Sequence, residues 1–391
     1  MKQTAIDGCA RVRKLEASFL LIVFLTFLCL PLLGVIFHLD AAPIWENRRL
    51  APFPAVSARP RDILNFPVKY AYYFKDHFAF RGRLVQAQAV LRVRWLRTSS
   101  SPSVILGKDG WLFYSGEQLA DYYGATRPFS DDEMARWLRV MEANSDWLKQ
   151  RGIKFYFVIV PEKQTIYPEY MPDNLVPVRP HSRLDQLIEY FKAHSSLEIM
   201  DLRPALWEEK ARHRLYSRTN SHWNELGAFV FYQAMIRKIS KSFPALHPLS
   251  ESDFSLVTEY GTNEDLTGLL GLNVLVSEEK LSLNLRQPST VSGLGKISRP
   301  SGGQMYWAVT EKNEPGLPRL ILFHDSFGDW LVEFLAENFG HAMYVYPQRM
   351  NSKLVESEAP DVVVVEMCER FLMTNPEQYQ VSAEDNQSSS R

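Results

Sequence analysis

The sequence predicts an α/β fold with a mainly parallel sheet and helices on both of its faces. Short runs of β-branched and aromatic residues, such as IKFYFVIVP (153–161) and PDVVVVEM (360–367), are typical of buried strands. Amphipathic helical patterns lie between these runs, and such alternation is typical of a parallel sheet. The chain has 391 residues, of which 46% are hydrophobic, so a large core can be buried.

The individual elements follow from local signals. SPSVILGKDGWLFY (101–114) predicts a hairpin, because two short apolar runs flank a Lys-Asp-Gly turn. A helix is expected at about 130–151, since Ser130 and Glu133 have capping-box spacing and Gly152 follows. The other expected elements are helices at 181–194, 224–243 and 327–340 and strands at 153–161, 197–202, 319–324, 342–346 and 360–367.

An apolar segment near the N-terminus predicts one membrane span. Residues 17–39 carry no formal charge and are long enough to cross a hydrocarbon core of about 30 Å. Lys2, Arg11, Arg13 and Lys14 precede the segment, which favours a cytoplasmic N-terminus and an exported remainder. A cleaved signal peptide is the alternative, but its apolar part is shorter and ends at a small-residue site. We therefore expect a single-pass signal anchor in a bacterial inner membrane, with the following domain in the periplasm.

The domain organisation follows from composition. Five prolines in residues 43–67 indicate an extended lead-out from the membrane. A region rich in Ser, Asn, Gly and Thr is too long for a simple connection, so it is expected to add strands or the rim of a site. The predicted divisions are a cytoplasmic 1–16, the anchor 17–39, a lead-out and helical segment 40–100, an α/β domain 101–372 with an irregular insertion at about 244–316, and a tail 373–391 that is disordered at its end.

Charge and cysteine content exclude some classes of protein. The net charge is −1, with 44 Lys and Arg against 45 Asp and Glu, so we expect no nucleic-acid partner. Cys9, Cys29 and Cys368 are the only cysteines, and the first two precede the exported part. No disulfide within the domain, structural zinc site, catalytic metal or cofactor is therefore predicted.

Ser326 is the first candidate for chemistry. RLILFHDSFGDW (319–330) ends a strand at His324 and turns through Asp325 and Ser326 toward a helix. Ligands of open α/β sheets bind beyond the carboxyl ends of strands, and backbone N–H groups at such a turn can stabilise an oxyanion. The alternative is that Asp325 or Ser326 only caps the helix.

The stretch TNSHWN (219–224) supplies a candidate base. A serine hydroxyl is a weak nucleophile and needs a base that is itself oriented by a third group. His222 fits that role, although a packed histidine at a helix entry is the simpler reading of this stretch alone. Asn220 has an alternative too, as an N-cap or turn residue. Trp223 is expected in the core or lining a cleft.

Lys163 is a third candidate, because it follows a buried strand in VIVPEKQTIYPEYMP (158–172). It is placed to supply a positive charge or a hydrogen-bond donor near the site. The alternative is a solvated lysine in a loop between strand and helix.

Six motifs in order resemble one known family. They are GKDGWLFY (107–114), VPEKQTIYPEYMP (160–172), TNSHWNELGA (219–228), DLTGLLGL (265–272), HDSF (324–327) and PDVVVVEMCER (360–370). This set resembles the alginate O-acetyltransferases, which are SGNH-hydrolase-like proteins. The resemblance implies an SGNH-like α/β domain with a circularly permuted motif order, acting on exopolysaccharide outside the cytoplasmic membrane together with a membrane-bound O-acyltransferase that relays the acetyl donor.

The resemblance also assigns residues. Ser326 matches the nucleophile of the family and His222 matches its base, but Asn220 stands where the family has aspartate. Asparagine can orient an imidazole yet carries no charge, so three outcomes follow: a slow transferase, an enzyme assisted by another carboxylate, or a polymer-binding relative without activity. Asp325 and Asp265 are the candidate substitutes, and Asp325 and Lys163 are candidate supporting residues.

The predicted function is a membrane-anchored O-acetyltransferase that moves acetyl groups to polysaccharide hydroxyls through a Ser-His acyl-enzyme mechanism. Backbone N–H groups after Ser326 are expected to bind the oxyanion. One alternative is a polysaccharide acetylesterase, in which water is the acceptor. The other is a non-catalytic scaffold or polysaccharide-binding subunit of an export complex, and Asn220 is the residue that motivates it.

Overall fold

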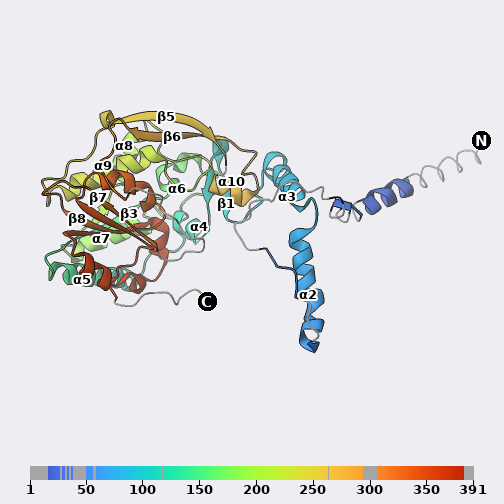
Figure 1. Ribbon diagram of the computed structural model, residues 1–391, viewed down its shortest axis with the longest axis horizontal. Helices are drawn as coiled ribbons and strands as arrows, with labels where there is room; N and C mark the ends of the chain where they lie inside the picture. Colours follow the sequence, from blue (N-terminus) through green and yellow to red (C-terminus); the bar gives the residue numbers. More distant parts are fainter. Residues whose placement is uncertain are drawn as a thin grey trace, which may run out of the picture. The chain divides into compact units, whose positions relative to one another are not determined.

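The computed structural model describes residues 16–26, 29–30, 33–34, 37, 50–55, 59–116, 118–262, 264–293 and 306–382. The chain divides into two compact units (Figure 1). The first comprises Met1–Ser100 with Leu270–Leu272, and the second comprises Ser101–Leu269 with Asn273–Arg391. Each unit is considered separately below.

The first unit is helical where it is described. It contains α2 (Pro60–His77), α3 (Arg81–Val90) and the π-helical turn η1 (Leu91–Trp95). The extended lead-out predicted for 43–67 is therefore wrong from Pro60 onward. Pro60 occupies the first turn of α2, where a proline costs no hydrogen bond, and Pro67 lies inside the helix.

The predicted membrane span at 17–39 lies partly outside the described residues. Residues 16–26 are helical, and most residues from 27 to 39 are not described. Within the described part of the chain, no helix is both long and apolar enough to cross a membrane. The span accordingly stays a prediction.

The second unit is built on a six-stranded sheet with the order β4-β3-β10-β8-β9-β7. All neighbours are parallel except β7, which pairs antiparallel with β9 at one edge. The mainly parallel sheet is confirmed. Its strands are β3 (Lys154–Val160), β4 (Ile199–Asp201), β7 (Tyr306–Glu311), β8 (Arg319–Phe323), β9 (His341–Tyr346) and β10 (Val362–Cys368).

Both faces of this sheet are covered, as predicted. Alternate residues of β10 enter two separate cores: Val364 joins the first and Val365 joins the second. The first core takes side chains from α8 (Arg203–Glu209) and α9 (Glu225–Ile239), and the second takes them from α5 (Asp131–Lys149) and α7 (Arg183–His194). Figure 1 shows these helix pairs on opposite faces of the sheet. The central strands are mainly apolar because both faces of the sheet are covered, although Glu366 is buried within β10.

Local signals placed several elements correctly. Strands β1 (Val104–Leu106) and β2 (Leu112–Tyr114) form the expected antiparallel hairpin. Ser130 caps α5 in a capping box with Glu133, and Gly152 follows the helix with a φ of 74°. A positive φ is accessible to glycine at little cost, which explains the clean end of the helix.

Three boundaries differ from the prediction. The helix expected at 327–340 is a 3₁₀ turn, η5 (Gly328–Leu331), followed by a short α11 (Val332–Ala336). The region 244–316 contains the hairpin β5 (Phe254–Gly261) and β6 (Glu278–Leu285), the helix α10 (Asp265–Leu270) and the edge strand β7. The packed fold also continues past 372, because Tyr379 is buried and its carbonyl oxygen accepts from Asn144 Nδ2 at 2.9 Å. Residues 383–391 lie outside the described part.

A buried carboxyl at the end of β10 predicts a pH dependence of stability. Glu369 is fully buried, and burial raises its pKa from 4.5 to about 7. The folded state therefore holds a proton that the unfolded state releases between these values, so the contribution of Glu369 to stability is fully present below pH 4.5 and is lost as the pH rises to 7. Between pH 4.5 and 7 this change lowers the free energy of unfolding by a value on the order of 3 kcal/mol. We expect Glu369→Gln to abolish this pH dependence, as measured by urea unfolding across the same range.

Candidate active site

Ser326 lies in a tight turn directly after β8. Gly328 closes the turn so closely that a Cβ atom at this position would lie 2.4 Å from the Cβ of His324. The backbone therefore needs glycine there for lack of space, while the Ser326 side chain is half-buried at the carboxyl end of the sheet. This is where the strand pattern predicted a reactive side chain.

Asp325 supports this turn from inside the protein. One carboxylate oxygen accepts from the backbone N–H of Phe327 at 2.8 Å and the other accepts from the backbone N–H of Cys368 at 2.7 Å. Asp325 is thus a bracing residue between the turn and β10, and its use as the substitute carboxylate for His222 is wrong. Its own N–H donates to Glu366 at 3.1 Å, and burial together with the charge of Asp325 raises the pKa of Glu366.

The bracing also corrects the expected oxyanion site. The N–H of Phe327 is engaged by the Asp325 carboxylate, and the N–H of Gly328 donates to the Asp325 carbonyl oxygen at 3.1 Å. The backbone N–H groups after Ser326 are therefore already used. Within the described residues, the N–H of Ser326 itself has no acceptor, which leaves it as the backbone donor for an oxyanion.

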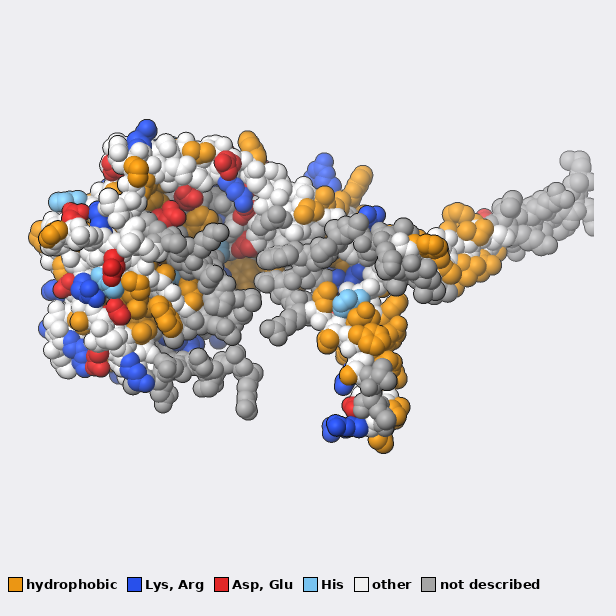
Figure 2. Space-filling view, in the orientation of Figure 1, with side chains coloured by type: hydrophobic (Ala, Val, Ile, Leu, Met, Phe, Trp, Pro, Cys, Tyr) orange, Lys and Arg blue, Asp and Glu red, His pale blue; other side chains and the backbone are white. Residues whose placement is uncertain are grey.

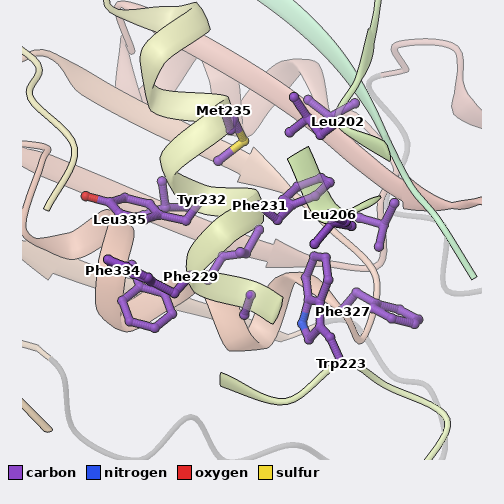
Figure 3. Close-up of a cluster of buried hydrophobic side chains, with 14 of the residues drawn as sticks. Leu202, Leu206, Trp223, Phe229, Phe231, Tyr232, Met235, Phe327, Phe334 and Leu335 are labelled. Carbon is purple, nitrogen blue, oxygen red and sulfur yellow. The ribbon is translucent and has the colours of Figure 1, made fainter. Parts of the chain in front are cut away.

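The structure brings His222 to Ser326 across 104 residues of sequence. The imidazole Nε2 lies 2.8 Å from Ser326 Oγ. Trp223 and Phe327, the neighbours of the two residues in sequence, pack edge to face in the core with their ring centroids 5.2 Å apart (Figure 3). Trp223 is completely buried, as predicted, so its packing fixes the backbone from which His222 projects.

Asn220 contacts the imidazole and does not cap the helix. The N-cap of α9 is Asn224, whose side-chain oxygen accepts from the N–H of Gly227 at 3.0 Å. Asn220 Oδ1 lies 2.9 Å from the Nδ1 atom of His222 and also accepts from the backbone N–H of His222 at 2.9 Å. Asn220, His222 and Ser326 thus form a continuous hydrogen-bonded row, which is the arrangement of a serine hydrolase triad.

Carboxylates from the 244–316 region hold the loop that carries the histidine. Glu264 Oε2 accepts from Asn220 Nδ2 at 2.6 Å, and Asp265 Oδ1 accepts from the N–H of Ser221 at 2.8 Å. Glu278, the first residue of β6, accepts from the N–H of Thr219 at 2.8 Å. Asp265 was a sequence candidate, whereas Glu264 and Glu278 were missed, because no periodic or spacing signal distinguishes them from other acidic residues of an irregular region.

Lys163 is buried below the same loop. Its Nζ donates to the carbonyl oxygens of Ser217 at 2.9 Å, Arg218 at 3.2 Å and Asn220 at 2.7 Å. Burial lowers the pKa of Lys163 to about 7. Lys163 is therefore a hydrogen-bond donor near the site, as predicted. Because it donates to the three carbonyl oxygens, its role is to position the loop. The alternative of a solvated lysine is wrong.

We expect Lys163→Met to lower turnover by roughly 10²-fold, because three unpaired carbonyls would let the histidine loop shift, and a 1 Å misplacement has an effect of this size. The measurement is acetyl release from a chromogenic acetyl ester. Lys312→Met is the matched control, since Lys312 also donates to a backbone carbonyl, that of Glu337, at 2.9 Å. Equal losses in both variants would show a general effect on stability.

Comparisons with known proteins agree with this geometry. Residues 104–292 match the family model described as the SGNH hydrolase-like domain of acetyltransferase AlgX. This part of the chain is therefore similar to that domain family. The matched residues include Asn220, His222, Glu264 and Asp265 but end before Ser326. The structure therefore supplies what the match does not, namely the serine that faces the histidine.

Curated relatives and a solved structure extend the comparison. A probable alginate O-acetylase AlgJ of Pseudomonas putida is 28% identical over 286 residues, which cover 69% of this chain and 70% of that protein. One from Pseudomonas syringae is 27% identical over 205 residues, 52% of this chain and 50% of that protein. The structure of Bacillus cereus PatB1 superposes with a TM-score of 0.53 at 16% identity, covering 71% of this chain and 99% of the other. The fold and the family resemblance predicted from the motifs are confirmed.

Proposed function

We propose that this protein is an SGNH-like O-acetyltransferase whose catalytic pair is Ser326 and His222. The observation that carries the proposal is the 2.8 Å contact between His222 Nε2 and Ser326 Oγ at the carboxyl end of the sheet. A nucleophile and a base within hydrogen-bond reach, with the base oriented by a third group, is the requirement for covalent acyl transfer. Asn220 is that third group.

The chemistry takes place in two steps. In the first, Ser326 Oγ bonds to the acetyl carbonyl carbon, its proton passes to His222 Nε2, and that proton then goes to the leaving group of the donor as its bond to the acetyl carbon breaks. In the second, a sugar hydroxyl gives its proton to His222 as its oxygen bonds to the acetyl carbon, the bond between that carbon and Ser326 Oγ breaks, and His222 returns the proton to Oγ. The backbone N–H of Ser326 faces the negative oxygen of both tetrahedral intermediates.

The acceptor in this proposal is an exopolysaccharide hydroxyl. Relatives carry the name alginate O-acetylase, which makes alginate oligomers the first acceptor to test. The acetyl donor is relayed by a membrane-bound O-acyltransferase, as the family resemblance implies. No cofactor or metal takes part in the proposed steps.

Product analysis tests the proposal. The full chain is incubated with a chromogenic acetyl ester and with alginate oligomers or without them. Transfer predicts acetylated oligomers whose amount accounts for most of the released chromophore. If the oligomers stay unmodified while acetate accumulates, water is the acceptor and the protein is an esterase.

We also propose that the first unit faces the outer surface of the cytoplasmic membrane. The segment 59–97 holds nine Lys and Arg against two Asp, which suits an anionic lipid surface. Along α2, Ile63, Pro67, Tyr70 and Phe74 recur at helical spacing, and hydrophobic side chains gather there (Figure 2). No residue of α2 is buried. An apolar helical face with tyrosines is typical of an interfacial helix.

A reporter fusion tests this location. Alkaline phosphatase, which is active only outside the cytoplasm, is joined to the C-terminus of the full chain. The proposal predicts phosphatase activity in the membrane fraction of bacterial cells. Activity confined to the soluble fraction, or a silent fusion that is nevertheless produced, would contradict it.

A further inference from the structure

We infer that Glu264 and Asp265 together replace the aspartate that Asn220 lacks, with Glu264 fixing the orientation of the Asn220 amide and Asp265 supplying the negative charge. This inference rests on the proposed function. It divides between two neighbouring carboxylates the two tasks that one aspartate performs in a serine triad: holding the correct imidazole tautomer and stabilising the imidazolium.

An unassisted asparagine is a poor partner because its amide has two ends. With the oxygen toward His222, the amide accepts from Nδ1–H, and Nε2 is left to accept the proton of Ser326. With the NH₂ group toward the ring, Nδ1 must be the acceptor, Nε2 carries the hydrogen, and the base cannot take a proton from serine. In a serine protease this wrong tautomer lowers turnover by about 10⁴-fold.

Glu264 removes the second orientation. A carboxylate accepts hydrogen bonds only, so the 2.6 Å contact between its Oε2 and the Asn220 side chain requires the NH₂ group to point to Glu264. The carboxylate is itself held by Lys280, whose Nζ lies 2.6 Å from Oε1, and its side chain is only 10% exposed. The oxygen of Asn220 must then face the imidazole, where the backbone N–H of His222 also donates to it.

Asp265 lies near the same ring nitrogen. Its Oδ2 is 3.8 Å from His222 Nδ1, and Ser221 Oγ, which lies 3.2 Å from Nδ1, donates a hydrogen bond to that carboxylate. The imidazolium formed during the reaction is therefore adjacent to a full negative charge, which a neutral Asn220 cannot provide. The remaining contacts of Asp265 are backbone N–H groups, which orient the carboxylate.

Exchanges at positions 220 and 264 test the orienting role, because the inference predicts a reversal of sign. In the natural background, Glu264→Met is expected to lower kcat by roughly 10-fold or more, whereas Glu264→Gln retains most activity because its amide oxygen still accepts from Asn220. In the Asn220→Asp background a carboxylate needs no orienting and is repelled by Glu264, so Glu264→Gln should raise kcat by roughly fivefold.

The contrary result is specific. If Glu264→Met and Glu264→Gln have the same effect in both backgrounds, Glu264 does not act through Asn220 and the orienting role is wrong. Comparing the two backgrounds cancels any general effect of the Glu264 exchange on folding. A thermal unfolding scan of each variant checks this directly. Lys280→Met, which removes the cationic partner of Glu264, is expected to give a smaller loss in the natural background and no gain in the Asn220→Asp background, because the Glu264 charge is then uncompensated.

The pH profile tests the role of Asp265. Asp265→Asn keeps the shape of the side chain but removes the charge beside His222, so the imidazolium is less stable. We expect kcat to fall by about 10-fold and the acidic limb of the kcat/KM profile to move to lower pH, because the base then loses its proton more easily. A fall in kcat with an unmoved acidic limb would show a purely structural role and overturn the inference.

Two results separate this inference from the proposed function. If Ser326→Ala retains full activity, the site is not catalytic and both fail. If Ser326→Ala is inactive but the 220 and 264 exchanges show no reversal and Asp265→Asn leaves the profile in place, the function stands and only the division of roles between Glu264 and Asp265 is wrong.

Discussion

Ser326→Ala is expected to lower acetyl release from a chromogenic ester by roughly 10⁴-fold or more, the size of loss found when a triad nucleophile is removed. Ser326 Oγ is the atom that faces His222 Nε2 at 2.8 Å. Alanine removes the oxygen that forms the acyl-enzyme and adds no bulk, so binding and folding should be preserved.

The matched control is Ser357→Ala, at an exposed position on α12 (Ser352–Glu358) where the hydroxyl contacts only the carbonyl of Leu354. This variant should retain full activity. If Ser326→Ala and Ser357→Ala release acetate at the rate of the natural protein, the nucleophile assignment is wrong. If both variants lose activity equally, the loss arises from the preparation of the variant proteins and not from the serine that was exchanged.

His222→Ala is expected to reduce activity by a similar factor, because the serine proton then has no acceptor. The more informative measurement is the double exchange of Ser326 and His222 to alanine. Residues that act as a unit are strongly non-additive, so the double variant should be hardly slower than either single one. Multiplying losses would mean that the two residues act independently, contrary to their direct contact.

A cellular experiment separates the enzyme from the scaffold alternative. If the Ser326→Ala and His222→Ala chains leave polymer acetylation intact while deletion of the protein abolishes it, the protein acts by assembly alone. The enzyme proposal predicts that each variant behaves as the deletion does.

Much of the fold was accessible from sequence because burial leaves a strong local signal. The mainly apolar runs at 154–160 and 362–368 form the interior strands β3 and β10, and the Ser130 capping box begins α5 at the predicted residue. Less accessible was the stretch 327–340, where an apolar helical pattern hides a change from a 3₁₀ turn to α-helix. The turn is set by the Asp325 carboxylate and by the tight approach of Gly328 to His324, which are tertiary contacts.

The site was predictable in part for the same reason. Ser326 follows the strand β8 and His222 precedes the helix α9, and the family resemblance paired them. Glu264 could not be recognised, since its role depends on lying 2.6 Å from an amide 44 residues away. Lys163 was misjudged in its role because nothing local reveals that a lysine after a strand is fully buried under three carbonyl groups.

The most direct measurement is the mass of the protein during the reaction. The full chain is mixed with excess acetyl donor in the absence of an acceptor, stopped with acid within the first turnover, digested and analysed by mass spectrometry. The predicted result is one acetyl group on the peptide that contains Ser326, absent from the Ser326→Ala protein and removed when alginate oligomers are added before the acid. An acetyl group on another residue that persists in Ser326→Ala, or turnover without any acetylated peptide, would contradict the Ser326 acyl-enzyme.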